Sequence, residues 1–371
     1  MPAIRHTSDP STDQADTPGT ERAPWWRRLP PIVALLLLAP WAAECSWGGF
    51  TVVDYPGVLI ILAPMYGGAA VLIREVARRT GGGWPAIVLL AGAFGVIQAG
   101  LVDQSLFNLG YLEDTEFADL VEANGRTVVP GLGFDAGQAI DFVGNHIALS
   151  ICAPIALVES FLPPHRRNRP WLGGPGLLAV GVLYVLGSLL IFSDDGGRKG
   201  FLASPAQVTF ASVVTLVLVG AALLPRRRPV ARPGRPPRPV VVGLAALGPH
   251  AVGYLVYGTG WLSVVIRLAA AGVLAVLLMR WSRRAGWGHR HVLAACAAGL
   301  AQAAVTAYLV PPYAPASPTV ALVSDIAVSV ITVTLVVAAF RRLRPADGKP
   351  AADPTDPAPA DVPATPDQRA S

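Results

Sequence analysis

The sequence predicts an all-α fold, a polytopic membrane helix bundle with about 10 transmembrane helices. Of its 371 residues, 53% are hydrophobic and only 14% are charged, a composition outside the range of soluble globular domains. The apolar residues gather in stretches close to the length of about 20 residues that a helix needs to cross a bilayer. Runs such as IVALLLL and VTLVLVGAALL do not alternate apolar and polar residues, so helices are expected rather than the strands of a closed barrel.

The expected helices begin and end where the apolar stretches do. In chain order they cover residues 31–47, 55–73, 84–102, 140–162, 175–192, 205–224, 240–258, 261–279, 291–310 and 319–340. The first stretch also resembles a signal peptide, because it follows the WWRR sequence at 25–28 and is itself followed by small residues. We favour a retained helix, because Trp41 and Glu44 disrupt a small-residue cleavage site; cleavage would leave the later helices unchanged.

The basic residues predict the orientation of the bundle. Of 29 Lys and Arg, only Arg126, Arg198 and Lys199 fall in gaps that we assign to the outside, and Arg267 falls within a helix. The others lie in the termini or in the gaps after even-numbered helices, which the positive-inside rule places in the cytoplasm. We therefore expect a multi-pass protein of the cell membrane with both termini cytoplasmic. Its expected partners are the lipid bilayer and, at the Arg-rich gaps, anionic headgroups; no nucleic acid is expected, and protein partners are left open.

Polar segments flank and interrupt the transmembrane domain, which we assign to residues 25–344. Residues 1–24 and 345–371 are predicted to be disordered cytoplasmic tails, because they cannot bury enough apolar area to offset the entropy of the chain. Residues 225–239 hold six Arg and six Pro, which favour an extended cytoplasmic connector. Residues 103–139 form the one long external segment, and it is acidic.

This external segment is expected to carry a short amphipathic helix on the outer face of the bundle. Phe117, Leu120 and Val121 fall at helical spacing, opposite acidic residues. Asn124-Gly125 would then end the helix as a C-cap does. A solvated acidic face is the preferred interpretation, because the acids lack the compact spacing of a divalent-cation site.

Helices two and three resemble helices eight and nine, which suggests an internal duplication. In this register Arg74 matches Arg280, and Gln98 matches Gln302. Both copies would start from the cytoplasm, so the repeat would be a parallel 4+2+4 arrangement, with helices five and six between two equivalent units. The alternative is chance, since any short cytoplasmic gap between two apolar helices has this composition.

Several polar residues fall within the predicted helices of the first half, where an ionisable group costs about 2.5–3.5 kcal/mol at mid-bilayer. Gln98 on helix three and His146 on helix four are expected at nearly the same depth. Asp141 and Asn145 share one face of helix four, and Asp103 lies just above helix three. These side chains predict a polar cavity that opens to the outside.

The second half offers a similar set. Arg267 and Asp325 are expected at equal depth on helices eight and ten, so they are the preferred candidates for an ion pair. His250 follows Pro249, whose missing N–H frees a carbonyl nearby. Each residue also has a structural interpretation: Arg267 can extend to the interface, and a histidine inside a bundle is commonly a hydrogen-bonded packing residue.

The remaining acids and the thiols are assigned no functional role. Glu75 lies among arginines and is expected to pair with one of them. Three further acids lie near predicted helix ends: Glu44, Asp54 and Glu159. The three cysteines occur singly in apolar sequence, as packed thiols do: Cys45, Cys152 and Cys296.

Common catalytic motifs are absent from the sequence. It contains no HExxH, GxSxG or Walker motif and no His/Cys metal spacing, so no catalytic residue, cofactor or metal ligand is predicted. Helix three does run QAGLVDQSLF from Gln98, and Phe142 to His146 read FVGNH. This resembles a decayed form of the CAAX-type intramembrane protease signature, an EExxxR helix followed by FxxxH.

The resemblance carries its own expectations. In that family the glutamates activate water and the histidine helps to bind metal. Here Gln98, Ala99 and Asp103 stand at the glutamate, glutamate and arginine positions, so the resemblance implies a non-catalytic relative. More generally, the Ala, Arg and Pro usage is similar to that of multi-pass proteins of high-GC bacteria.

Three functions remain open at the level of the sequence. A permease for a small solute or an ion is preferred, on the suggested repeat, the proline-broken helices and the polar groups at matched depth. The second is a structural or partner-binding membrane protein without an internal site. The third is the non-catalytic protease relative. A water-accessible cavity that joins the polar residues would separate the first from the second.

Overall fold

The computed structural model describes residues 29–123, 126–225 and 232–343. Within these ranges the chain is helical and forms no strand, which confirms the all-α prediction. The predictions for residues 1–24 and 345–371, and for the helix end at 124–125, fall outside the described residues.

The helices follow the predicted apolar stretches, and four of them are interrupted or ended by π-helical segments (η). The long helices are α1 (Leu29–Pro40) with η2 (Trp41–Cys45), α2 (Tyr55–Leu62) with η3 (Ala63–Gly67) and α3 (Gly68–Arg79), α4 (Gly83–Ile97) with η4 (Gln98–Val102), α6 (Ala136–Asn145) with η5 (His146–Cys152) and α7 (Ala153–Ser160), α9 (Gly174–Ser193), α11 (Pro205–Leu223), α12 (Pro239–Leu255), α13 (Trp261–Trp281), α14 (His289–Thr306) and α15 (Pro318–Arg342). Three short helices lie in the connections: α5 (Ala118–Ala123), α8 (Pro164–Arg167) and α10 (Asp195–Arg198).

Local sequence explains where several helices begin. The side chains of Asp135, Ser204 and Ser317 each accept a hydrogen bond from the backbone N–H three residues later, at the starts of α6, α11 and α15. Pro205 and Pro318 follow the two serines, at the first helical position, where the missing N–H is not needed.

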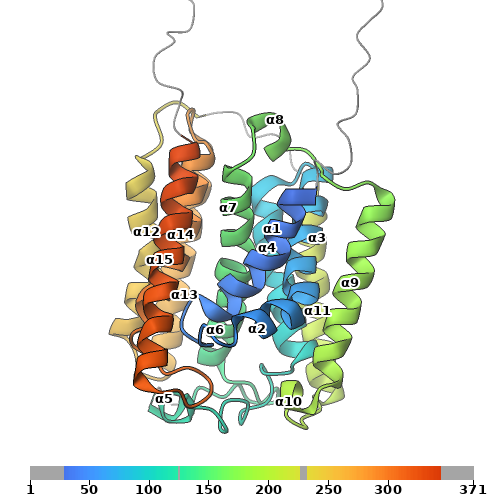
Figure 1. The fold of residues 1–371 in the computed structure, drawn as a ribbon, viewed down its shortest axis with the longest axis vertical. Coiled ribbons are helices and arrows are strands. Elements are labelled where there is room, and N and C mark those ends of the chain that lie inside the picture. The colour runs from blue at the N-terminus through green and yellow to red at the C-terminus, as the bar shows by residue number, and fades with distance from the viewer. Residues whose placement is uncertain (1–28, 124–125, 226–231, 344–371) are drawn as a thin grey trace, which may run out of the picture.

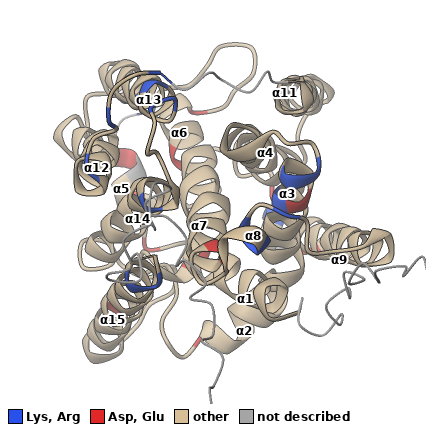
Figure 2. Ribbon diagram, turned by 90° about the horizontal axis from the view of Figure 1, so that it is seen from above, with Lys and Arg blue, Asp and Glu red and all other residues tan. Residues whose placement is uncertain are grey.

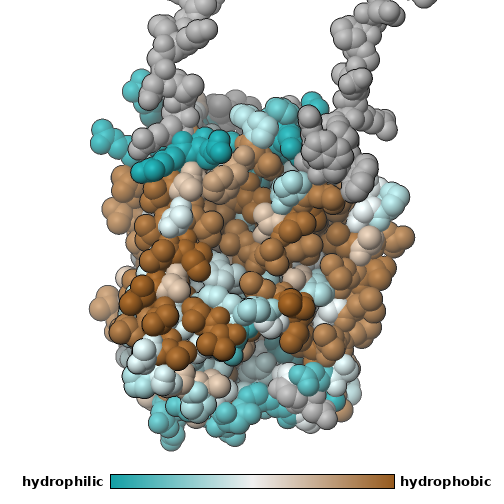
Figure 3. Space-filling view, viewed as in Figure 1, coloured by the Kyte–Doolittle hydropathy of each residue, from teal (hydrophilic) through white to brown (hydrophobic). Residues whose placement is uncertain are grey.

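The outer surface is that of a membrane-embedded protein. Seven of the described helices are long and apolar enough to cross a membrane, by length and composition: Tyr55–Arg79, Gly83–Val102, Ala136–Ser160, Gly174–Ser193, Pro205–Leu223, Trp261–Trp281 and Pro318–Arg342. Two further apolar helices are shorter, Leu29–Cys45 and Pro239–Leu255. Large apolar side chains point outwards, with Leu178, Leu216 and Leu255 exposed by 70%, 69% and 83%. On the face in Figure 3 they form a hydrophobic belt between two hydrophilic ends, as a bilayer requires.

The charged residues separate to the two ends of the bundle. Arginines gather at one end, on α8 and at the ends of α3, α13 and α15, and we call this the basic end (Figure 2). The acidic end lies opposite and carries α5 and α10 (Figure 1). Leu29 and Leu343, the first and last described residues, both lie at the basic end (Figure 1).

The helices form two groups, which α6 and α7 join (Figure 2). In the first, α1 packs on η3 and α7, α3 packs on α4 and α9, and α11 runs along α4. In the second, α12 packs on α13 and α14, and α14 packs on α15. The neighbours of α1 and α12, the first helix of each unit in the suggested duplication, therefore differ. The 4+2+4 repeat stays a prediction.

A buried ion network joins the helices of the first group near the basic end. Arg74 and Glu159 are both 0% exposed, and the Arg74 Nε lies 3.1 Å from the Glu159 carboxylate. Arg74 also donates to Glu75, at 2.9 Å, and its guanidinium carbon lies 3.5 Å from the centre of the Trp171 ring. Arg78 binds both oxygens of Glu159, at 3.0 and 2.6 Å. We call these residues the arginine clamp.

The clamp confirms one expectation and corrects another. Glu75 pairs with arginines, as predicted: it binds Arg74 and, at 3.0 Å, Arg79. Glu159, which was given no role, accepts two guanidinium groups in the interior. The place of Glu159 near a helix end did not predict this pairing. The connection through Trp171 folds back over α3 and α7 and excludes water from the Glu159 carboxylate.

Residues 103–139 contain one short helix, α5, which is six residues long. Phe117 precedes it and packs against Trp47 and Tyr313, with ring centres 5.6 and 5.3 Å apart. The Leu120 carbonyl accepts a hydrogen bond from the Tyr257 hydroxyl. The segment therefore covers the acidic end of the bundle and connects its two helix groups.

Candidate functional site

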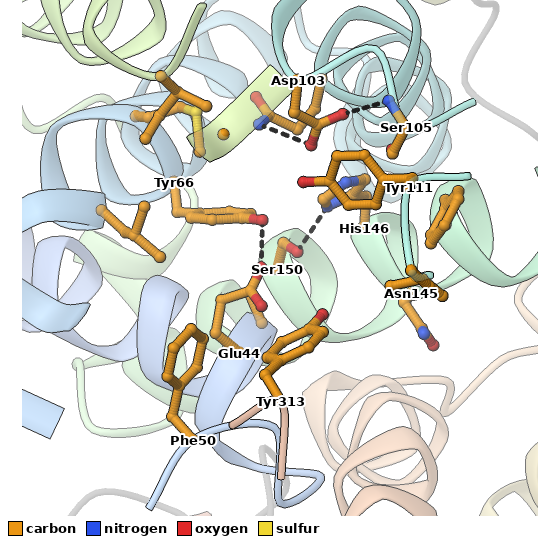
Figure 4. Close-up of a pocket in the computed structure, with 18 of the residues that line it drawn as sticks. Glu44, Phe50, Tyr66, Asp103, Ser105, Tyr111, Asn145, His146, Ser150 and Tyr313 are labelled. Atoms are coloured by element: carbon orange, nitrogen blue, oxygen red, sulfur yellow. Dashed lines mark hydrogen bonds between the residues drawn. The ribbon is translucent and has the colours of Figure 1, made fainter. Parts of the chain in front are cut away.

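A cavity of about 370 Å³ lies inside the first helix group, toward the acidic end (Figure 4). Its polar lining residues are Glu44, Gln98, Asp103, Ser105, Thr115, Asn145, His146, Ser150 and Lys199. Its aromatic lining residues are Trp47, Phe50, Tyr66, Tyr111, Phe142 and Tyr313. This volume is within the usual range of small-molecule sites.

All four described π-helical segments contribute to the cavity wall. Glu44 comes from η2, Tyr66 from η3, Gln98 from η4, and His146 with Ser150 from η5. A π turn bonds residue i to residue i+5 and so carries one extra residue, which rotates the following side chains relative to a regular helix. The hydrogen bonds from the N–H of Ser46 to the Trp41 carbonyl, at 2.9 Å, and from that of Asp103 to the Gln98 carbonyl, at 3.0 Å, have this spacing.

Two prolines help to explain these segments. Pro40 ends α1 directly before η2, and Pro64 lies inside η3. Neither proline can donate a backbone hydrogen bond, so a preceding carbonyl is released from the regular pattern. The wider turns then bring polar side chains to the interior of a bundle that is otherwise built from Ala, Gly, Ile and Leu.

Glu44 and Tyr66 face one another across one side of the cavity (Figure 4). The Tyr66 hydroxyl donates to Oε1 of Glu44, and Tyr66 is 3% exposed. The bond ties η2 to η3. Glu44 is a carboxylate within the bundle, and it has no ion-pair partner among residues 29–123, 126–225 and 232–343.

Gln98 and Asp103 form the opposite side. The Gln98 Nε2 donates to Oδ2 of Asp103 at 3.3 Å, and the Ser105 N–H donates to Oδ1 at 2.9 Å. Since a carboxylate can only accept, the Gln98 amide must turn its N–H groups toward Asp103. Its carbonyl oxygen is then buried with no hydrogen-bond partner, on a side chain that is 1% exposed. Burial raises the pKa of Asp103 to about 6, against the opposing effect of these hydrogen bonds.

His146 lies between these two pairs of residues. Its Nδ1 is 3.1 Å from the Ser150 hydroxyl. The imidazole packs against Tyr66 and Phe94, with ring centres 5.7 and 5.4 Å apart. Asn145, the preceding residue, also lines the cavity. The histidine is held by its neighbours, and one edge of its ring remains toward the cavity (Figure 4).

Loops of the acidic end form the outer part of the cavity. The Tyr313 N–H donates to the Gly49 carbonyl at 2.9 Å, which places its ring against Phe50, with ring centres 5.3 Å apart. Lys199 pairs with Asp114 and lies 5.2 Å from the centre of the Tyr111 ring. Burial raises the pKa of Tyr111 and that of Tyr313, so both hydroxyls stay protonated at neutral pH.

Four of the eight predicted site residues line this cavity: Gln98, Asp103, Asn145 and His146. The other four lie elsewhere: Asp141, His250, Arg267 and Asp325. The first set comes from helices three and four, where depth and helix face were both considered. In the second set Asp141 also lies on helix four, whereas the other three residues lie on helices seven, eight and ten, which belong to the other helix group.

The predicted ion pair between Arg267 and Asp325 is wrong. Arg267 binds Asp141 instead, through both of its terminal nitrogens, and so joins α13 to α6. Asp325 is half-buried on α15, next to Ser324, and His250 is half-buried on α12. Equal depth did not identify the partner, because α13 packs on α6 rather than on α15.

Sequence reasoning missed several residues of the cavity. Glu44 was assigned to a helix end, and the tyrosines were not considered: Tyr66, Tyr111 and Tyr313. One signal was available, since Pro40 and Pro64 each stand shortly before one of these polar residues in an apolar stretch. Tyr111 and Tyr313 reach the cavity through the folding of long connections, which no helical periodicity predicts.

The described residues contain no group of three or more His, Cys, Asp or Glu that could hold a metal ion. The polar side chains of the cavity can themselves accept hydrogen bonds and bind charge. Compared with models of known families, with characterised proteins and with solved structures, the chain finds no match.

Proposed function

We propose that this protein is a ten-span membrane protein of permease type, which takes a small solute into the cavity from the acidic end. The observation that carries the proposal is a polar cavity inside the bundle that reaches the loops of one end only. By the positive-inside rule the basic end faces the cytoplasm, so the solute would enter from outside. A purely structural protein would have no need of such a cavity.

The closed side supports the same function. Between the cavity and the basic end the helices pack through small and apolar side chains, such as Ala70, Val71 and Ile155, all 0% exposed. The arginine clamp lies beyond them. A permease must open such a barrier during its cycle, so the clamp is the contact whose rearrangement would release the solute to the cytoplasm.

Thiol labelling from each side of the membrane tests this proposal. The native cysteines are replaced by alanine, and single cysteines are introduced at Asn145 in the cavity and at Ala77, which is 0% exposed near the basic end. Exposed reference positions are Asp119 at the acidic end and Arg341 at the basic end. An impermeant maleimide should label Asn145→Cys only from the side that labels Asp119→Cys.

A permease must also reach a second state, in which the cavity opens toward the basic end. Ala77→Cys should react slowly from the side that labels Arg341→Cys, and faster when Glu159→Gln weakens the clamp. If Ala77→Cys stays unreactive in both backgrounds while Asn145→Cys is labelled, the cavity belongs to a fixed binding protein and transport is excluded. Labelling of Asp119→Cys and Arg341→Cys from the same side would overturn the topology itself.

Anionic lipid is the partner that we propose for the outer surface. An apolar groove runs along α14 between α12 and α15, lined by alanines and by aliphatic side chains such as Leu244 and Val336. Arg238 and Arg290 line its basic end and are exposed, and neither has an ion-pair partner in the part of the chain that the structure describes. A phospholipid fits this charge pattern, with acyl chains in the groove and its phosphate between the two guanidinium groups.

A second candidate function is a non-catalytic relative of the CAAX-type intramembrane proteases. One observation favours it: Gln98, Asp103 and His146, the positions that the resemblance singles out, line the same cavity. Such a protein would hold a peptide rather than a small solute. A photo-crosslinking residue in place of Asn145 should then form a peptide adduct in cells, whereas the permease proposal predicts no such adduct.

A further inference from the structure

We propose that the cavity binds a small protonated amine. This inference rests on the proposed solute-binding function and names the chemical class of the solute. It follows from three properties of the lining that point to the same ligand: unsatisfied hydrogen-bond acceptors, uncompensated negative charge and an aromatic wall.

The first property is an excess of acceptors. The Gln98 carbonyl oxygen is buried without a hydrogen-bond partner in the part of the chain that the structure describes, which is unfavourable unless a ligand supplies a donor. The carboxylates of Glu44 and Asp103 can only accept when ionised. The Tyr66 hydroxyl, which also lines the cavity, already donates to Glu44. A ligand that complements this set must donate hydrogen bonds.

The second property is charge. Glu44 and Asp103 line the cavity, and neither forms a salt bridge within residues 29–123, 126–225 and 232–343. Lys199 lines the rim but is paired with Asp114. Two carboxylates inside a bundle of low polarity attract a cation, because the surrounding protein screens their charge less than bulk water does. An anionic ligand would meet repulsion from the same groups.

The third property is the aromatic wall. Six aromatic side chains line the cavity, and three of them, Tyr66, Tyr111 and Tyr313, surround the space between Glu44 and Asp103 (Figure 4). Aromatic faces attract an organic cation through the negative charge of the ring face. They would also contact the hydrocarbon part of an amine. Bare metal ions gain less from such a wall and require a compact set of oxygen ligands instead.

The three properties together select among cations. A quaternary ammonium would satisfy the charge and the rings but would leave the Gln98 oxygen unpaired. A protonated primary or secondary amine satisfies all three, with one N–H to Gln98 and the others toward Glu44 and Asp103. The volume of about 370 Å³ limits the ligand to a small molecule.

Isothermal titration of the full chain in lipid nanodiscs tests the inference with five defined probes. The cations are 2-phenylethylammonium and n-butylammonium, and the matched neutral and anionic molecules are 2-phenylethanol and phenylacetate. We expect at least one of the two ammonium probes to bind about tenfold or more tightly than the alcohol and the carboxylate. Trimethyl(2-phenylethyl)ammonium, which keeps the charge but has no N–H, should bind about tenfold more weakly than its parent.

Variants connect the binding to this cavity. Glu44→Gln and Gln98→Leu should each weaken binding of the preferred ammonium by about tenfold or more. Glu122→Gln, an exposed acid of the same end, is the matched control and should leave the affinity unchanged. Should Gln98→Leu fail to fold, Gln98→Asn keeps an amide and should still weaken binding, because its oxygen lies one carbon further back.

The outcomes separate this inference from the function on which it rests. Equal or tighter binding of 2-phenylethanol or phenylacetate, or no binding of either ammonium, overturns the amine assignment even if thiol labelling shows two alternating states. Amine binding that responds to Glu44→Gln, together with an Ala77→Cys that never reacts, supports the amine site and excludes transport.

Discussion

The guanidinium carbon of Arg74 lies 3.5 Å from the centre of the Trp171 ring, and this contact closes the basic end of the first helix group. The Trp171 N–H in turn donates to Glu75 at 2.7 Å. Arg74 is thus enclosed by an aromatic face, two carboxylates and the carbonyls of the connection after α8. Its charge can be buried only because every side of the guanidinium is occupied.

The clamp predicts a large loss of stability when Glu159 is neutralised. Glu159→Gln leaves two buried guanidinium groups without their shared carboxylate, and removing one partner of a buried pair typically costs about 3–5 kcal/mol. The change can be followed by heating the protein with a thiol-reactive dye, because Cys45 and Cys152 are buried until it unfolds. The melting temperature of Glu159→Gln should fall well below that of the wild type.

The matched control for this prediction is Glu113→Gln. Glu113 also pairs with an arginine, Arg126, but at 3.4 Å and with 70% of its side chain exposed. Exposed pairs contribute only about 0–1 kcal/mol, so its melting temperature should hardly change. Equal effects of Glu113→Gln and Glu159→Gln would show that the clamp is not the contact that holds this end together.

Amine binding should depend on pH through Asp103. Its pKa is raised to about 6, mainly by burial, so it is ionised at pH 8 and largely protonated at pH 5. The polar groups that face it are Gln98, Ser105, Glu44, Tyr111 and Tyr313. A cation favours the ionised form, so its affinity should be highest above pH 6 and fall as the pH drops through that value.

The stability of the empty protein should depend on pH with the opposite sign to amine binding. Because the folded-state pKa of Asp103 lies above its ordinary value of 3.8, the protonated carboxyl suits the empty cavity better. Its contribution to stability is therefore complete below about pH 4 and is lost as the pH rises through about 6. Asp103→Asn should reduce both pH dependences, whereas Asp119→Asn, at an exposed acid, should preserve them.

The helices and the separation of charge could be predicted from the sequence, because both follow from the cost of placing polar groups in hydrocarbon. The depth of a residue along its helix could also be predicted. Gln98 and His146 were expected at nearly the same depth, and both line one cavity. The rotation of each helix about its axis, and the helices that it contacts, could not be predicted from the sequence. Arg267 therefore meets Asp141 rather than Asp325, and the π turn at Trp41–Cys45 brings Glu44 inward from what resembled a helix end.

The suggested duplication shows the same limit. Gln98, in the cavity, was matched to Gln302, whose amide instead donates to Tyr254 and Thr306 at 3.0 and 2.6 Å. Arg74 is fully buried, whereas its match Arg280 is exposed. Similar sequence around these two turns does not produce similar surroundings here, because the clamp requires Glu159 and Trp171, which lie outside the matched segments.

The ion pair between Arg267 and Asp141 predicts a rescue by charge exchange. The Arg267 side chain is only 16% exposed, so Asp141→Asn should lower the melting temperature by leaving its guanidinium group without a carboxylate. Asp141→Arg would place two cations together and should lower the melting temperature further. Combining it with Arg267→Asp should restore part of that loss. If Asp325→Arg rescues Arg267→Asp and Asp141→Arg does not, Arg267 pairs with Asp325, as the sequence predicted.

The lipid groove predicts selective retention of anionic phospholipid. Arg238→Gln combined with Arg290→Gln should reduce the phosphatidylglycerol that copurifies with the protein, measured by native mass spectrometry against phosphatidylethanolamine. Arg341→Gln combined with Arg342→Gln removes the same charge from the same end without changing a residue that lines the groove, and should change retention much less. A similar loss in both double variants would indicate a general basic surface rather than a site.

Tyr66 allows the two roles of an aromatic lining residue to be separated. Tyr66→Phe keeps the ring for a bound cation but removes the hydroxyl that donates to Glu44. The empty protein should lose about 1–3 kcal/mol of stability, because Glu44 is left without that donor, whereas the amine should bind at least as tightly as before. Ligand addition should therefore raise the melting temperature of Tyr66→Phe more than that of the wild type.

Tyr66→Leu removes the ring as well and should weaken amine binding by about tenfold. Tyr308→Phe is the control, since Tyr308 is exposed and its hydroxyl bonds to Ser329, at 3.1 Å, outside the cavity. If Tyr66→Phe and Tyr66→Leu bind the amine equally, the ring does not contact the ligand. The negative charge of Glu44 and Asp103 would then have to select the cation without the aromatic wall.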